Sequence, residues 1–443
     1  MSNKDLLERS LAAVWHPCTQ MKQHAGGKQA LPMIPIASGK GVWLHDFDGR
    51  RYLDGISSWW VNLFGHCNPR INAALRDQLE QLEHVILAGC THRPVIELSE
   101  RLSTLTLGQL GHCFYASDGA SATEIALKMS FHAWRNQGRR EKQEFLCLSG
   151  SYHGETVGAL AVTDVALFKD AYAPLIRPAT TVATPDARLA KDGETAADVA
   201  RRAAAALECQ LDEHHLHIAA LIVEPLIQCA SGMAMYDPEY LRLARSLCDR
   251  YEVHLICDEI AVGCGRTGTF FAHEQAGIRP DFLCLSKGIS GGYLPLSMVL
   301  TTDSVYAAFY DDSVSRGFLH SHSYTGNALA CRAALATLDI FAEDQVIDAN
   351  RGLAEHLGSC LQPLADHPQV RHLRRRGMVA AFDVLSDDPR FSERFYRQAL
   401  ANGILLRPIG NTVYFMPPYV ISRDECDFLA TRAIAALDSA LHE

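Results

Sequence analysis

Residues 281–292 read DFLCLSKGISGG and combine a short apolar run, one lysine and a glycine-rich loop. The run from Phe282 to Leu285 predicts a buried strand, and this strand leads directly to Lys287. A lysine is costly to bury unless it has a partner. The position of Lys287 therefore raises the question of which groups surround it.

Two other apolar runs also end on a charged residue. AALIVEP (219–225) leads to Glu224, and VHLICDE (253–259) leads to Asp258. The spacing between these runs suits strand–helix–strand connections, and the carboxyl ends of parallel strands share the edge of a sheet where ligands bind. One edge would thus carry two acids and a lysine. An ordinary buried ion-pair network is the alternative interpretation.

Helical stretches alternate with short apolar runs from about residue 70 to residue 330. The predicted helices are 71–84, 120–136, 194–211 and 237–251, and the predicted strands lie near 113–116, 144–149, 218–224, 253–258 and 282–286. This alternation predicts an α/β fold with a mostly parallel sheet covered by helices.

A chain of 443 residues is too long for one compact core. We expect an N-terminal segment, 1–70, of strands and turns that contributes to a small domain, with a hairpin at Asp48–Gly49. A large domain would follow at 71–330. The remainder, 331–443, would form a smaller α+β domain, with a long helical stretch, a strand at 378–385, a helix at 392–401, strands near 404–407 and 412–416, and a final helix.

Composition narrows the class of protein. The net charge is −10, and the one basic cluster, Arg374–Arg376, is interpreted as a solvated loop. Both observations argue against nucleic acid or an anionic membrane as the main partner. No apolar run is long enough to span a bilayer, and the N-terminal stretch lacks a signal-like apolar core. Cysteines within strand-like runs favour a reducing cytoplasm. The cluster EHHLH (213–217) lacks partner cysteines, so no metal site is predicted.

Two further stretches indicate what the acids and the lysine could bind. In FYASDGASATEIALKMS (114–130), a turn opens a helix, where the backbone N–H groups of Gly119 and Ala120 would suit a phosphate. An ordinary helix cap is the alternative. GSYHGET (150–156) places Tyr152 and His153 between glycines, where an aromatic ring could lie flat on a planar ligand.

A phosphate site, an aromatic platform, an acid and a lysine together describe pyridoxal phosphate. Asp258 would keep the pyridine nitrogen protonated, and Lys287 would form a Schiff base with the aldehyde. The stretch GCGRTG (263–268) also fits a dinucleotide motif, but no acid follows at a second strand end about 20 residues on.

These motifs resemble the class III aminotransferases of fold type I, on LIVEP (221–225), CDEIAVGCGRTGTFFAHEQAGIRPDFLCLSKGISGG (257–292) and HSHSYTGNALAC (320–331). The resemblance implies pyridoxal phosphate, with contributions from Glu224 and Tyr152. It also implies a homodimer with shared active sites, in which HSHSYTGN reaches the neighbouring subunit. There His322 and Ser323 would bind the phosphate and Ser321 would contact substrate; Ser323 stands where Thr is common.

Within the family, WHPCTQMK (15–22), LDGISSWWVNLFGH (53–66), SYHGET (151–156) and LLRPIGNTVYFMPPY (405–419) are similar to the biotin-pathway branch. This implies S-adenosylmethionine as amino donor and 8-amino-7-oxononanoate as acceptor. The predicted substrate contacts are Cys18, Trp59, Trp60, Tyr152, Lys287, Ser321, Arg407 and Tyr414.

The residue types of these contacts agree with those substrates. Trp59 and Trp60 offer π-rich walls to an aliphatic chain and a sulfonium, although packing at a dimer interface is an alternative. Arg407 offers a bidentate fork to a carboxylate, and Tyr414 offers a hydroxyl. Cys18 stands where this branch commonly has Tyr.

The sequence therefore predicts a cytoplasmic, homodimeric aminotransferase in which Lys287, Asp258 and Tyr152 are catalytic and no metal takes part. One alternative is a class III aminotransferase that uses an ω-amino acid or diamine with pyruvate or 2-oxoglutarate. A non-catalytic pyridoxal-phosphate-binding regulator usually carries a basic DNA-binding segment, which is not seen here. A dehydrogenase is the third alternative.

Overall fold

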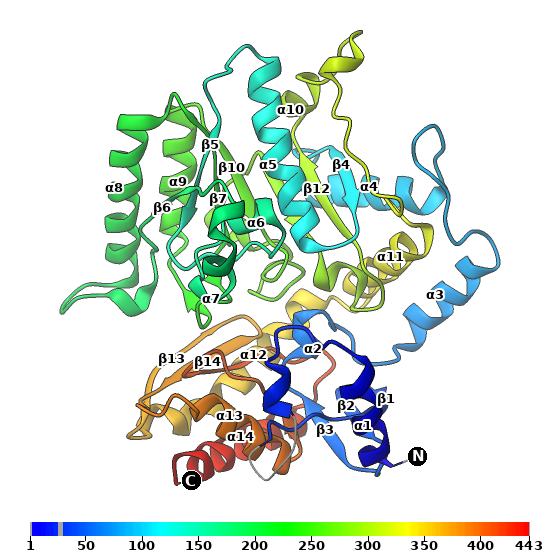
Figure 1. The fold of residues 1–443 in the computed structure, drawn as a ribbon, viewed down its shortest axis with the longest axis vertical. Coiled ribbons are helices and arrows are strands. Elements are labelled where there is room, and N and C mark those ends of the chain that lie inside the picture. Colours follow the sequence, from blue (N-terminus) through cyan, green and yellow to red (C-terminus); the bar gives the residue numbers. More distant parts are fainter. Residues whose placement is uncertain (1, 25–29, 443) are drawn as a thin grey trace. The chain divides into compact units, whose positions relative to one another are not determined.

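The computed structural model describes residues 2–24 and 30–442 (Figure 1). The chain divides into two compact units, one formed by Arg70–Ala349 and one formed by residues 1–69 together with 350–443. No helix in the described ranges is long and apolar enough to cross a membrane.

The larger unit is built on a seven-stranded sheet in the order β4-β12-β11-β10-β7-β5-β6. Its strands are β4 (His112–Ala116), β5 (Glu144–Leu148), β6 (Thr180–Val182), β7 (Ile218–Val223), β10 (His254–Asp258), β11 (Phe282–Leu285) and β12 (Ser297–Thr301). β10 is parallel to both β7 and β11, whereas β12 is antiparallel to β11 and β4. The mostly parallel sheet is confirmed, and the antiparallel β12 is an addition to the predicted set. A small hairpin, β8 (Ile227–Gln228) and β9 (Ala234–Met235), completes the strands of this unit.

The larger unit also contains helices, several of which pack on this sheet. They are α3 (Pro69–Leu79), α4 (Arg93–Leu105), α5 (Gly119–Asn136), α6 (Val157–Ala161), α7 (Ala166–Lys169), α8 (Ala196–His214), α9 (Glu239–Arg250), α10 (Asp303–Ala307) and α11 (Ala328–Glu343). α5 packs across β7, β11 and β12, and α8 lies beside α9 (Figure 1). The core under α5 joins Ile125 to Ile222, Ile256 and Cys284, all fully or almost fully buried.

α11 lies in the larger unit because it packs against α4 and against the turn that contains Lys287. The boundary between the units therefore follows Ala349. The sequence-based boundary at residue 330 would separate α11 from the helix it packs against. Burial of the alanine-rich face of α11 determines its assignment.

The smaller unit contains two sheets. One has the order β1-β2-β3-β15, from β1 (Ile36–Lys40), β2 (Trp43–Asp46), β3 (Arg51–Asp54) and β15 (Ile404–Leu405); the other joins β13 (Val370–Arg376), β14 (Val379–Val384) and β16 (Thr412–Phe415). Its helices are α1 (Asn3–Ala13), α2 (Ser57–Trp60), α13 (Phe391–Ala401), α14 (Arg423–His442) and most of α12 (Val346–Leu361), which begins before the boundary at Ala349. The predicted hairpin at Gly49 is confirmed by the antiparallel pairing of β2 with β3, and β3 pairs in parallel with β15.

Two local predictions are wrong. The predicted strands and turns of the N-terminal segment are present at β1–β3, but the prediction is wrong for its start, which forms α1, stabilised by a capping box between Ser2 and Asp5. Arg374–Arg376 were interpreted as a solvated loop, but they form the end of β13. Arg374 is held there because its guanidinium donates to the Asp383 carboxylate across the ladder at 2.9 Å.

Candidate active site

The three predicted strand ends meet at one edge of the large sheet. Glu224 directly follows β7, Asp258 is the last residue of β10, and Lys287 follows β11 after Ser286. These strands are adjacent and parallel, so their carboxyl ends point the same way. Glu224 and Asp258 are each only 4% exposed, and Lys287 is partly buried. The structure therefore brings the two acids and the lysine together, as the sequence predicts.

Burial changes the protonation of this group. Removal from water lowers the pKa of the Lys287 ammonium, although Asp258, Cys229 and Glu224 act in the opposite direction. Burial raises the pKa of Glu224 to about 7, and the Asp258 charge adds to that effect. Lys287 also has φ +44, in the left-handed region that costs free energy for a side chain of this kind. A partly buried lysine whose pKa is lowered is typical of an acid–base or nucleophilic centre.

Glu224 fixes the loop that carries Tyr152. Its carboxylate accepts hydrogen bonds from the backbone N–H of Tyr152 at 3.1 Å and from that of Cys229 at 3.0 Å. The Tyr152 hydroxyl donates to Glu155 at 2.9 Å, and the ring meets Phe168 edge-on at 5.5 Å. The aromatic ring predicted as a platform is thus held at its backbone by one of the two strand-end acids.

Asp258 has a buried partner that the sequence analysis did not include among the site residues. Its Oδ2 lies 2.7 Å from Nδ1 of His153, whose side chain is fully buried, and its Oδ1 accepts from the backbone N–H of Ile260 at 3.1 Å. Within the described residues, Nε2 of His153 has no hydrogen-bond partner. The two bonds fix the orientation of the carboxylate. The adjacency of His153 to Tyr152 was the only signal in the sequence.

The predicted phosphate site is the start of α5. Asp118 caps this helix by accepting from the N–H of Ser121 at 2.9 Å. The first N–H groups of a helix lack partners within the helix, and in α5 these belong to Gly119 and Ala120. Gly119 packs so closely that a Cβ there would lie 3.0 Å from Ile260 Cγ2. Because Ile260 also bonds Asp258, the helix start is anchored beside the end of β10.

Ser321, His322 and Ser323 lie in the loop before α11. Nε2 of His322 lies 3.1 Å from Nε2 of His320, and Nδ1 of His320 lies 2.7 Å from Nζ of Lys128 in α5. The His322 backbone N–H donates to Thr325 at 3.0 Å. Ser321 and Ser323 are exposed. Within one copy of the chain, this loop is thus held by its own residues and by α5.

The predicted substrate contacts in the smaller unit touch one another. The Arg407 guanidinium lies 5.2 Å from the Trp59 ring centre and donates to the Cys18 carbonyl oxygen at 3.2 Å. The indole N–H of Trp60 donates to the Tyr414 hydroxyl at 3.1 Å, with the rings edge-on. Trp59 is 45% exposed and Trp60 only 6%. Arg407, Trp59 and Cys18 therefore form one contacting set. Trp60 and Tyr414 form a second, and the two sets meet at the adjacent residues Trp59 and Trp60.

The tryptophan pair stands on an unusual backbone. Four consecutive residues have positive φ and none is glycine: Ser57 (51°), Ser58 (46°), Trp59 (71°) and Trp60 (72°). The N–H of Trp60 donates to the Ile56 carbonyl at 2.9 Å, and the N–H of Val61 donates to that of Ser57 at 3.0 Å. α2 is thus a turn of left-handed helix, a conformation that costs roughly 1–2 kcal/mol per L-residue. The residue types of SSWW (57–60) do not predict this left-handed turn.

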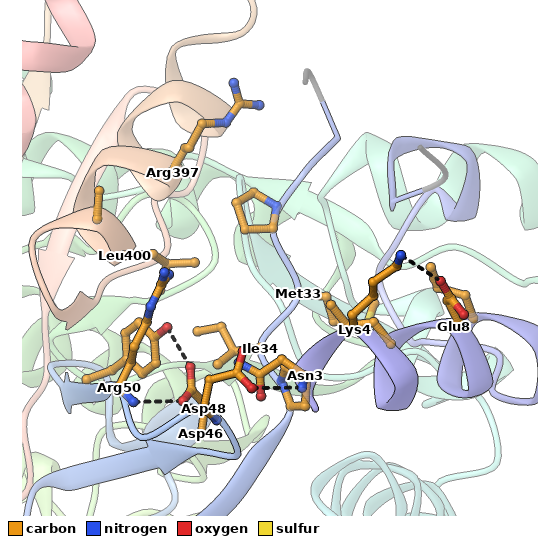
Figure 2. A pocket seen from close by; sticks show the side chains of 16 residues that line it. Asn3, Lys4, Glu8, Met33, Ile34, Asp46, Asp48, Arg50, Arg397 and Leu400 are labelled. Atoms are coloured by element: carbon orange, nitrogen blue, oxygen red, sulfur yellow. Dashed lines mark hydrogen bonds and ion pairs between the residues drawn. The ribbon is translucent and has the colours of Figure 1, made fainter. Parts of the chain in front are cut away.

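A cavity of about 550 Å³ in the smaller unit lies elsewhere (Figure 2). It is bordered by α1, by the turn after β2 and by the end of α13. Lys4 pairs with Glu8 at 4.0 Å, and the Asp46 carboxylate accepts from the backbone N–H of Arg50 at 2.8 Å (Figure 2). None of the predicted site residues lines it. We therefore do not assign the chemistry to this cavity.

Potential metal ligands also gather outside the predicted site. Among the described residues, His356, Cys360 and Asp427 place their ligand atoms within 4.8 Å of one another. Oδ1 of Asp427 already lies 3.0 Å from Nε2 of His356 and accepts from the Cys360 thiol at 2.9 Å, so these three groups bond one another. In the EHHLH cluster, His215 bonds to the Leu211 carbonyl. We assign a metal to neither group.

Known proteins resemble the chain over its whole length. Residues 24–437 match the family model described as aminotransferase class-III. The chain is 48% identical to the adenosylmethionine-8-amino-7-oxononanoate aminotransferase of Helicobacter pylori, over 99% of this chain and 98% of that protein. It is 37% identical to the protein of that name in Geobacter sulfurreducens, over 97% of this chain and 95% of the relative.

Solved structures agree with this resemblance. The crystal structure of adenosylmethionine-8-amino-7-oxononanoate aminotransferase from Methanocaldococcus jannaschii superimposes with a TM-score of 0.91 at 32% identity, covering 98% of this chain and 99% of that one. A thermostable (S)-enantioselective omega-transaminase from Thermomicrobium roseum superimposes with a TM-score of 0.94 at 30% identity, covering 100% and 99%. The predicted fold class is confirmed.

Proposed function

The chain belongs to the class III aminotransferase family, and from that premise we propose that it moves an amino group from S-adenosylmethionine to 8-amino-7-oxononanoate, giving 7,8-diaminononanoate for biotin synthesis. It is a pyridoxal-phosphate-dependent aminotransferase. The buried group of Lys287, Asp258 and Glu224 at one sheet edge supports the chemistry. The name of the relative at 48% identity over nearly the full chain supports the substrates.

The residues present fit pyridoxal phosphate. Lys287 would hold it covalently through Nζ, Asp258 would pair with its ring nitrogen, and the N–H groups of Gly119 and Ala120 would bind its phosphate. The half-buried ring of Tyr152 would cover one face, held through its backbone by Glu224. When bound, the cofactor supplies an electron sink and carries nitrogen between the two substrates.

Lys287 performs the proton transfer in this proposal. With its ammonium pKa lowered by burial, Nζ is neutral in a larger fraction of molecules near neutral pH than an exposed lysine. The neutral amine would take the proton from the donor carbon that bears the amino group and deliver it to the bound cofactor, and in the acceptor half-reaction the transfer would run in the opposite direction. Asp258 stays oriented throughout because His153 and the Ile260 N–H hold its two oxygens.

The smaller unit provides the substrate contacts of the proposal. Arg407 binds the acceptor carboxylate, and Trp59 and Trp60 line the aliphatic chain and the donor sulfonium. The Trp59 ring and the Cys18 carbonyl limit the positions of the guanidinium before substrate arrives. Tyr414 offers its hydroxyl beside the Trp60 indole.

Arg407→Ala is expected to raise the KM for the keto acid at least tenfold. The loss of a charge-assisted pair to a carboxylate costs roughly 1.5–3 kcal/mol. Steady-state kinetics with each substrate varied in turn measures the effect. Arg397→Ala is the matched control, because Arg397 is an arginine of the same unit that bonds the Ala30 carbonyl. Equal losses in both half-reactions would indicate a structural arginine instead.

S-adenosylmethionine is expected to convert the bound cofactor to its aminated form in a single turnover, followed by absorbance. Cys18 supplies no π surface, so Trp60→Ala should harm this half-reaction more than Cys18→Ala does. Cys18→Tyr should be tolerated or beneficial, since an added aromatic contact is worth roughly 0.5–1.5 kcal/mol. This experiment tests the proposed donor directly.

The second candidate is an aminotransferase that uses an ω-amino acid or diamine with pyruvate or 2-oxoglutarate. The TM-score of 0.94 with the omega-transaminase of Thermomicrobium roseum favours it. Conversion of the cofactor by a simple amine but not by S-adenosylmethionine would replace the first candidate with this one.

The proposal includes a homodimer whose subunits share their active sites. The loop that holds Ser321, His322 and Ser323 would reach the site of the other copy, with His322 and Ser323 at the phosphate. Large apolar side chains around this loop are exposed in the single chain: Val314 is 74% exposed, Leu319 78% and Tyr324 65%. A second copy would cover them. Free buried thiols such as Cys257 and Cys284 support the proposed cytoplasmic location.

A further inference from the structure

We infer that Asp54 and His66 are positioning residues that hold the left-handed turn Ser57–Trp60 in the conformation that presents Trp59 and Trp60 to the substrates. This inference rests on the proposed function only for the role of the tryptophans. Neither Asp54 nor His66 touches the indole rings in the contacts described above, so their effect would pass through the backbone of the turn.

Asp54 is the polar anchor of the turn. It ends β3, is fully buried, and accepts from four donors. Oδ1 accepts from the backbone N–H of Ser58 at 2.9 Å and of Ile56 at 3.4 Å, and Oδ2 accepts from the Ser58 hydroxyl at 2.7 Å. The fourth donor is Nε2 of His66, 3.0 Å from Oδ2. A buried carboxylate needs such partners, and here two of them belong to the first half of the turn.

His66 fixes the anchor from the other side. Nε2 of His66 donates to the Asp54 carboxylate, since a carboxylate accepts, and Nδ1 lies 3.1 Å from the Asn62 amide nitrogen. The backbone N–H of His66 donates to the Gly41 carbonyl at 2.7 Å, and the N–H of Gly41 donates to the His66 carbonyl at 3.1 Å. A Cβ on Gly39 would lie 2.7 Å from the His66 Cβ, so the imidazole is also confined sterically.

The first and last residues of the turn are attached to β16, which carries Tyr414, and to Met416, which follows it. The Ser57 hydroxyl donates to the Met416 carbonyl at 2.7 Å, and the Trp60 indole donates to Tyr414. Four non-glycine residues do not stay left-handed by their own preference, because the right-handed form is lower in free energy. Hydrogen bonds at both ends therefore hold the conformation, and loss of the Asp54 anchor should let the turn relax.

Relaxation would reach the substrate contacts through Trp59. Its ring lies against the Arg407 guanidinium, and the next residue bonds Tyr414. A change at Asp54 should therefore alter the positions of the Trp59 and Trp60 rings and of the Arg407 guanidinium. The cofactor residues of the larger unit should keep their chemistry, because Lys287, Asp258 and Glu224 belong to a different compact unit.

The test compares Asp54→Asn with Asp46→Asn. Asparagine keeps the size of the anchor but cannot accept from all four donors. Asp46 is a matched control: it is 4% exposed, it ends the neighbouring strand β2, and it also accepts from backbone N–H groups and a hydroxyl, that of Tyr52. We expect Asp54→Asn to raise the KM of both substrates about tenfold or more and to weaken the near-ultraviolet circular dichroism of the indoles. Asp46→Asn should lower only the melting temperature.

Ser58→Gly separates an effect on the conformation of the turn from a general loss of stability. Glycine enters the left-handed region without steric cost, so Ser58→Gly placed in the Asp54→Asn background should recover part of the KM and of the indole signal. If Asp54→Asn does not fold, His66→Ala removes one donor and should give a smaller KM rise of the same kind. Unchanged KM values and indole signal in a folded Asp54 or His66 variant would overturn the inference, as would no recovery with Ser58→Gly.

The substrates for these assays are those that the wild-type protein accepts in the donor experiment. If a simple amine replaces S-adenosylmethionine there, the proposed donor fails, while the KM of the working amine and the indole signal still report on the turn. The two failures are therefore distinguishable.

Discussion

Lys287→Ala is expected to lose multiple-turnover activity by at least roughly 10⁴-fold, equivalent to about 5.4 kcal/mol. The change removes the amine that would hold the cofactor and move the proton, and alanine offers no titratable group in its place. Purified variant should stay folded and should show no cofactor absorbance that survives denaturation after borohydride treatment. Added small primary amines should restore part of the activity, because they can replace the missing base.

Lys142→Met is the matched control for this prediction. Lys142 is also buried, with its pKa lowered to about 8 by burial, and it donates to the carbonyls of His215 and Ile218 at 2.9 and 3.0 Å. Ile218 begins β7, so Lys142 lies at the edge of the sheet opposite to Lys287. Its replacement should lower stability and leave turnover intact. Substantial turnover by Lys287→Ala without added amine would refute the role of Lys287.

Asp258→Asn is expected to retain the cofactor but to reduce the rate by at least roughly 100-fold, about 2.7 kcal/mol. A neutral amide cannot stabilise a protonated ring nitrogen, which needs a negative charge beside it. Single-turnover absorbance with the donor separates this rate from product release. The spectrum of the bound cofactor should change with pH differently from that of the wild type.

Asp281→Asn is the control for Asp258. Asp281 precedes β11 at the opposite edge of the sheet, where it pairs with Arg245 at 2.7 Å. We expect it to lower the melting temperature without reducing the rate. A rate for Asp258→Asn within about tenfold of wild type, roughly 1.4 kcal/mol, would show that Asp258 is not the partner of the ring nitrogen.

Strong local patterns made the core of the larger unit predictable. β7 and β11 are apolar throughout and β10 is apolar from Leu255 to Cys257, as expected of strands buried on both faces, and each run leads to a charged residue at the same edge. The rule that parallel strands share an edge then placed Glu224, Asp258 and Lys287 together before any contact was known.

Elements that depend on distant partners were not predictable in this way. The SMVLT run of β12 is short and apolar, a pattern that periodicity does not distinguish from a helical segment. Its antiparallel place between β4 and β11 is set by those strands. β13 has three successive arginines, and only the pairing with β14 and Asp383 makes it a strand.

Two parts of the candidate site were missed for related reasons. The His153 contact with Asp258 joins residues 105 positions apart, and nothing in the local sequence predicts such a bond. The left-handed turn contains no glycine, the residue that usually marks positive φ. The turn is held by hydrogen bonds to the Asp54 carboxylate and to the carbonyl of Met416, which is distant in the sequence.

The parallel pairing of β3 with β15 has a consequence for how the protein is made. Leu53 pairs with Ile404, so β3 leaves the ribosome long before its partner strand exists. At 5–20 residues per second, that delay is roughly 20–70 s. Throughout it, the larger unit can fold, while the N-terminal segment waits with an unpaired strand edge open to aggregation. Nascent chains should therefore need protection at their N-terminal end, and slow translation should lower the yield of native protein.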